Sequence, residues 1–121
     1  DITSPADALK RCETGVAGLM IGRAAMTNPW IFSEIRSALN GEENIFQPSL
    51  EDRWNLIRRH CTEEIACKGN EAAAMASMRA RLMAYTKGFP GARPLREKFS
   101  KLSSLAELED LIAGANSVAV Q

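Results

Sequence analysis

Apolar positions in the first part of the chain follow a helical pattern, then a continuous run, then a second helical pattern. Ser4 and Pro5 are typical of a helix start, and this helix is predicted to end near Gly15. Residues 16–21 are apolar without alternation, which favours a strand buried on both faces, as in a parallel sheet. A further helix is predicted over residues 28–41. The pattern up to residue 41 therefore predicts part of an α/β fold.

From residue 49 onward the pattern is helical only. Apolar residues recur at helical spacing in four stretches, at residues 49–69, 71–86, 92–101 and 104–115. Ser104 and Glu107 have the spacing of a capping box at the start of the last stretch. The short connections favour antiparallel neighbours, so residues 49–115 are predicted to form a four-helix domain. Residues 42–48 are interpreted as a linker and residues 116–121 as a frayed tail.

Composition narrows the possible classes of protein. The 15 basic and 15 acidic side chains cancel, so the total charge alone indicates no anionic partner. No apolar run reaches the roughly 20 residues that a membrane span needs, and no signal segment opens the chain. Cys12, Cys61 and Cys67 lack disulfide or zinc-site spacing, so they are interpreted as reduced thiols of a cytoplasmic protein without a metal site. Because the sequence begins with Asp1 and not with methionine, we expect the chain to be cut from a longer protein.

The positive charge is concentrated between residues 78 and 101. This window holds one acid, Glu97, and seven basic residues: Arg79, Arg81, Lys87, Arg93, Arg96, Lys98 and Lys101. Such a concentration on one helix–turn–helix segment indicates an anionic partner, with nucleic-acid phosphate as the leading candidate. A solvent-exposed helix face explains the same charges equally well. Phe89, in the turn of this segment, either stacks on a base or closes the helical core.

Gly22 and Arg23 follow the predicted strand and precede a helix start. Glycine lets a phosphate approach the backbone, the first amides of a helix donate hydrogen bonds to it, and arginine adds a positive fork. In a (β/α) barrel, such a phosphate site usually follows the last two strands. A simple turn with a solvated arginine fits the same two residues, so the pattern alone leaves both interpretations open.

Segments from both halves of the chain together resemble bacterial tRNA-dihydrouridine synthases. They read DITSP, GLMIGRAA and NPWIF near the start, and MRARLMAYTKGFPGARPLR later. The first three resemble the end of that family's barrel, and the last resembles the signature of its C-terminal helical domain. The resemblance implies a mainly α chain. Residues 1–41 would be the last helix, strand and helix of a (β/α)8 barrel, and residues 49–115 a four-helix bundle that binds tRNA.

The resemblance also implies an activity and its sites. The complete protein would use FMN and NADPH to reduce uridine in tRNA to 5,6-dihydrouridine. Flavin-phosphate contacts are implied at Asp1, Gly22 and Arg23. The tRNA contacts are expected at Arg79, Arg81, Lys87, Arg93 and Arg96. The family often has Lys-His where this chain has Ala80-Arg81, so no histidine role is transferred.

The family's catalytic cysteine lies in an earlier barrel loop, so no catalytic residue is assigned here. The chain alone is expected to be inactive and to bind FMN poorly.

A lone parallel strand cannot pair its backbone groups. Residues 16–21 are therefore expected either to pack on the helical domain or to pair two copies of the chain. Two other functions remain as alternatives. One is a helical protein-interaction module whose basic window meets an acidic protein. The other is part of a different FMN-dependent barrel oxidoreductase, which would explain Gly22 and Arg23 but not the helical signature.

Overall fold

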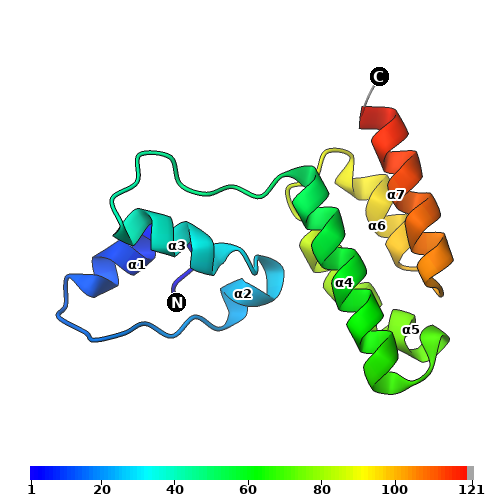
Figure 1. Ribbon diagram of the computed structural model, residues 1–121, viewed down its shortest axis with the longest axis horizontal. Coiled ribbons are helices and arrows are strands. Elements are labelled where there is room, and N and C mark those ends of the chain that lie inside the picture. Colours follow the sequence, from blue (N-terminus) through cyan, green and yellow to red (C-terminus); the bar gives the residue numbers. More distant parts are fainter. Residues whose placement is uncertain (120–121) are drawn as a thin grey trace. The chain divides into compact units, whose positions relative to one another are not determined.

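The computed structural model describes residues 1–119, and all the regular structure in that range is helical (Figure 1). This confirms the prediction of a mainly α chain. The chain divides into two compact units, with the boundary between Ser49 and Leu50. The first unit contains α1 (Pro5–Cys12), α2 (Arg23–Thr27) and α3 (Ile31–Leu39). The second contains α4 (Leu50–Lys68), α5 (Glu71–Tyr85), α6 (Ala92–Phe99) and α7 (Leu105–Ala119).

The first unit is organised by the contact between α1 and α3. α1 begins where the sequence predicted, because Ser4 Oγ accepts a hydrogen bond from the amide of Asp7 at 3.2 Å. Ala8 on α1 packs with Ile31 and Ile35 on α3, and all three side chains are buried. This small core holds the two helices together.

The predicted strand at residues 16–21 is not formed. These residues have no regular structure and run as an extended connection between α1 and α2. Leu19 and Ile21 pack against the core of α1 and α3, whereas Val16 and Met20 are 50% and 92% exposed. A strand needs a neighbouring strand to pair its amides and carbonyls, and residues 1–119 contain no other strand. The apolar run therefore buries only part of its surface.

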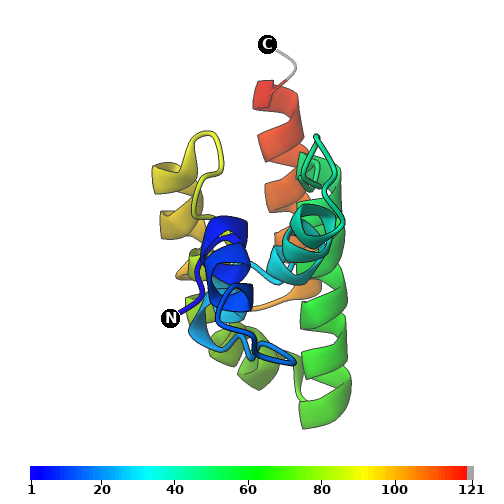
Figure 2. The same ribbon diagram turned by 90° about the vertical axis from the view of Figure 1, so that its left-hand side faces the viewer.

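The second unit is built on an antiparallel pair of helices, α4 and α5. Gly69 ends α4 in the left-handed conformation, with φ at 68°, and Asn70 caps α5 by accepting a hydrogen bond from the amide of Ala73 at 2.8 Å. α6 packs against α5, and α7 packs beside α4 (Figures 1 and 2). The shared core contains Trp54, Ile57, Cys61, Met75, Met78, Leu82, Tyr85, Phe89, Leu95, Phe99, Leu102, Leu108 and Ile112.

The capping box predicted at Ser104 and Glu107 forms only in part. Ser104 Oγ accepts from the amide of Glu107 at 3.1 Å, as predicted. The Glu107 carboxylate, however, reaches one residue further back and accepts from the amide of Ser103 at 2.9 Å and from its hydroxyl at 2.8 Å. These two hydrogen bonds lower the pKa of Glu107, and the bond from the Ser103 amide has the larger effect. At α1, the Asp7 carboxylate accepts from Thr3 in the same way.

The tail was predicted to fray from residue 116, but α7 continues to Ala119. Ala115 packs against the core, and the hydroxyl of Ser117 donates to the carbonyl of Ala113 at 3.0 Å, so the last turns keep helical contacts. Residues 120–121 lie outside the described residues.

The ring of Phe99 is fully buried and lies edge-on to Trp54, with ring centroids 6.3 Å apart. We expect Phe99→Ala to lower the free energy of unfolding of the second unit by about 3–5 kcal/mol, because it removes the ring and leaves a cavity. Urea unfolding followed by circular dichroism measures this loss. Phe46→Ala is the matched control, since Phe46 is 40% exposed and its change should stay below about 1 kcal/mol. Equal losses in the two variants would contradict this description of the core.

Candidate functional site

Asp1, Gly22 and Arg23 come together in the first unit. They line one cavity of about 510 Å³. The Asp1 carboxylate and the Arg23 guanidinium form an ion pair, and the Arg23 side chain remains 83% exposed. The sequence therefore indicated three residues that lie close together, although Asp1 and Arg23 are 22 positions apart.

The same cavity is lined by a second arginine, which the sequence did not indicate. Arg11, in the last turn of α1, also lines it and is exposed. An anion in the cavity would meet the two positive charges of Arg11 and Arg23 and the one negative charge of Asp1. α2 spans only five residues, so its dipole adds little to this balance. Helical spacing does not indicate that Arg11 lines this cavity, because the path of the loop after α1 determines which residues Arg11 faces.

The five predicted tRNA contacts do not form one continuous face. Arg79 and Arg81 differ by about 200° around α5, so they lie on opposite edges of the helix. Arg79 is half-buried and donates from Nε to the carbonyl of Leu102 at 3.0 Å. Arg81 is half-buried on the edge that carries Tyr85. Burial raises the pKa of Tyr85, and the positive charge of Arg81 opposes that rise.

The other three predicted contacts lie where α5 ends and α6 begins. Lys87 and Arg93 are exposed to solvent. Arg96, one turn after Arg93 on α6, is also exposed as a residue, but its Nε donates to Thr86 Oγ1 at 3.3 Å. This end of the second unit therefore carries three exposed basic residues close together in the chain. We call Lys87, Arg93 and Arg96 the α5–α6 basic surface.

Phe89 belongs to the core. It is 6% exposed, and its ring lies perpendicular to that of Trp54 with centroids 5.2 Å apart. The guanidinium of Arg53 lies 5.4 Å from the Phe89 ring centroid. Of the two interpretations of Phe89, the structure supports closure of the core. It also gives Arg53 a contact that sequence spacing did not indicate.

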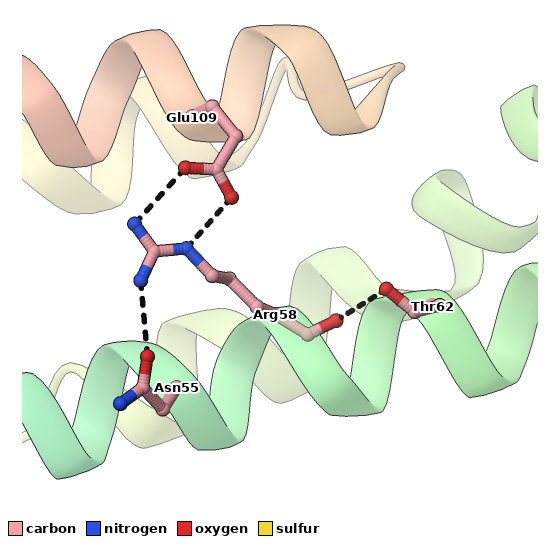
Figure 3. A network of polar contacts seen from close by, with 4 residues as sticks. All are labelled: Asn55, Arg58, Thr62 and Glu109. Carbon is pink, nitrogen blue, oxygen red and sulfur yellow. Dashed lines mark hydrogen bonds and ion pairs between the residues drawn. The ribbon is translucent and has the colours of Figure 1, made fainter.

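A polar network on the surface ties α4 to α7 (Figure 3). The Arg58 guanidinium binds both carboxylate oxygens of Glu109, at 2.6 and 2.9 Å, and donates to Asn55 Oδ1 at 3.1 Å. The Thr62 hydroxyl donates to the Arg58 carbonyl at 2.8 Å. The hydrogen bond with Glu109 raises the pKa of Arg58. Arg58 thus has a structural role, and its charge is matched within the second unit.

Cys61 is not an activated nucleophile. Burial raises the pKa of Cys61 to about 11, so its thiol stays protonated at neutral pH. Cys12 is half-buried and Cys67 is exposed, and all three are free thiols. The described residues hold no group of three side chains suited to bind a metal ion. None of the helices in the part of the chain that the structure describes is long and apolar enough to cross a membrane.

Comparison with known proteins gives a consistent result. Residues 1–120 match the family model described as dihydrouridine synthase. The chain is 33% identical over 113 residues to a probable tRNA-dihydrouridine synthase of Mycobacterium tuberculosis. The matched region covers 93% of this chain and 29% of the relative. The chain is 37% identical over 103 residues to tRNA-dihydrouridine synthase B of Pseudomonas aeruginosa, covering 84% of this chain and 31% of the relative. The chain therefore spans about a third or less of the curated relatives it matches.

Proposed function

This chain belongs to the dihydrouridine synthase family, and from that premise we propose that it is part of an FMN-dependent enzyme that reduces uridine to 5,6-dihydrouridine in tRNA. NADPH would be the reductant, and the enzyme would act in the cytoplasm. The observation that carries the proposal is the family match over residues 1–120, which includes both units. Relatives that share 33–37% identity are named tRNA-dihydrouridine synthases.

Within that enzyme, we assign the first unit to the end of a (β/α)8 barrel. The continuous apolar run at residues 16–21 supports this assignment, because a barrel strand is buried on both faces. Its extended path between α1 and α2 also suits a strand that has no neighbouring strand here. The second unit is assigned to the helical tRNA-binding domain.

The cavity at Asp1, Gly22 and Arg23 fits one end of FMN, its phosphate group. Arg23 supplies an exposed guanidinium, and the backbone at Gly22 is open, since a Cβ added there would meet no atom within 4 Å. Asp1 would orient Arg23 through their ion pair and would not itself bind the phosphate, because both are anionic. When bound, FMN supplies the hydride chemistry. No residue of this chain is assigned a catalytic role.

Arg23→Ala tests the phosphate assignment. In the complete enzyme, we expect it to weaken FMN binding roughly tenfold or more, because a hydrogen bond to a charged group contributes about 1.5–3 kcal/mol. Flavin fluorescence titration measures the change. Arg36→Ala, an exposed arginine of α3, is the control and should leave affinity unaltered. The chain alone should bind FMN weakly and reduce no uridine. Equal affinity in the Arg23 and Arg36 variants would remove Arg23 from the site.

We assign tRNA binding to the α5–α6 basic surface, with Arg79 beside it. Its support is the accessibility of Lys87, Arg93 and Arg96 and the single acid, Glu97, in the basic window. Arg81 lies on the opposite edge of α5, so it is not part of this surface.

Replacing Arg93 and Arg96 together by alanine tests this surface. We expect weaker binding to a tRNA transcript and a slope of log affinity against log salt that is about two units shallower, one for each lost phosphate contact. Fluorescence anisotropy across a salt series measures both. Arg59→Ala is the control, because Arg59 is exposed on α4 and pairs with Glu63 at 2.9 Å. An unchanged slope, with nuclease-resistant capture of an acidic protein, would favour the protein-interaction alternative.

We also propose that the isolated chain self-associates through residues 16–21, because Val16 and Met20 expose apolar surface. Met20→Asp should then shift the chain towards monomer in size-exclusion chromatography with light scattering. Met83→Asp, on α5, is the control, since Met83 is also partly exposed but lies in the other unit. A wild-type chain that stays monomeric at every concentration would contradict the proposal.

A further inference from the structure

Two arginines of the second unit are fixed by hydrogen bonds of the same kind. Arg79 donates from Nε to the Leu102 carbonyl at 3.0 Å, and Arg96 donates from Nε to Thr86 Oγ1 at 3.3 Å. For both side chains, the hydrogen bond found within residues 1–119 uses Nε. The two terminal amino groups of each guanidinium keep their donors for another acceptor.

Both fixed arginines lie along one edge of α5. Arg79 and Thr86 are seven residues apart, or about two helical turns, so they face the same way. Arg96 reaches this edge from α6 through its contact with Thr86. The edge thus carries one guanidinium from α5 itself and one from α6.

Thr86 is an unusual anchor for an exposed arginine. It caps the end of α5, and its side chain is fully buried, at 0% exposure. Its hydroxyl donates to the Met83 carbonyl at 2.7 Å, which leaves the oxygen lone pairs to accept from Arg96. A buried group that is itself hydrogen-bonded has one orientation, so the acceptor offered to Arg96 is fixed. The flexible arginine side chain then loses part of its freedom before any ligand arrives.

We propose that Thr86 is a positioning residue for phosphodiester recognition, which acts by holding Arg96 with its terminal amino groups free. A guanidinium binds a phosphate through two parallel hydrogen bonds, and this requires the planar group to be oriented correctly. Fixing it in advance reduces the ordering cost that binding would otherwise carry. The proposal rests on the tRNA binding assigned above and names the residue that prepares its Arg96 contact.

Three variants test the role of Thr86. Thr86→Val removes the hydroxyl, Thr86→Ser keeps it, and Arg96→Lys keeps the charge but removes Nε and the planar fork. We expect Thr86→Val and Arg96→Lys each to weaken binding to an unmodified tRNA transcript roughly three- to tenfold, the range set by ordering one long side chain. Thr86→Ser should bind like the parent. Arg59→Lys should leave affinity unchanged, because exposed Arg59 pairs with Glu63 on α4 and lies outside the α5–α6 basic surface.

A double-mutant cycle separates positioning from simple stability. If Thr86 acts through Arg96, Thr86→Val has no further effect on affinity in the Arg96→Ala background. Thr62→Val is the control for loss of a hydroxyl that donates to a helical carbonyl. Thr62 is exposed, and among the described residues its hydroxyl accepts no hydrogen bond from an arginine. Thr62→Val should leave affinity unchanged.

Two results would overturn the proposal. The first is an equal loss of affinity from Thr86→Val with and without Arg96, which would show that Thr86 acts only through the fold. The second is unchanged affinity in Arg96→Lys and Arg96→Ala while Lys87→Ala and Arg93→Ala still weaken binding. That result would remove Arg96 alone and leave the tRNA-binding function standing. If no variant of the α5–α6 basic surface changed affinity, the proposed function itself would fail.

Discussion

Backbone amides and carbonyls that leave water must find hydrogen-bond partners, and the two units of this chain meet this requirement differently. The second unit meets it within each helix, so α4 to α7 can pack around a core without help from another chain segment. The first unit contains an apolar run at residues 16–21 whose pattern suits a strand, and a strand depends on neighbours. Without them the run stays extended, with Leu19 and Ile21 packed and Met20 in solvent. The regular structure of the described residues follows from this one requirement.

Part of the basic charge serves the fold itself. Arg79 donates to the backbone carbonyl of Leu102, between α6 and α7, and Arg96 donates to the hydroxyl of Thr86 at the end of α5. Arg58 likewise joins α4 to α7 through Glu109. A count of positive charges along the sequence cannot separate these structural arginines from the accessible Lys87 and Arg93. The distinction depends on which edge of a helix each residue occupies and on what that edge meets.

Much of the fold could be predicted from the sequence, because caps and helical spacing are local signals. Ser4 and Asn70 cap helices through bonds to residues three positions ahead, and such spacing is visible in the chain. The prediction at Glu107 was wrong by one residue, because its carboxylate accepts from the amide of Ser103 and not from that of Ser104. Of the candidate site, the sequence indicated Asp1, Gly22 and Arg23 through family resemblance. It could not indicate Arg11 or Arg53, since their contacts depend on a loop and on a ring from another segment.

The pair of Arg58 and Glu109 joins residues 51 positions apart. Closing a flexible loop of that length costs about 3.5 kcal/mol, from the logarithmic dependence on loop length. An exposed ion pair contributes only about 0.2–1 kcal/mol. The pair therefore cannot hold α7 in place by itself, and the buried side chains of Leu108 and Ile112 must provide most of the attraction. What the bidentate contact adds is alignment, since it fits only one rotation and one axial position of α7 against α4.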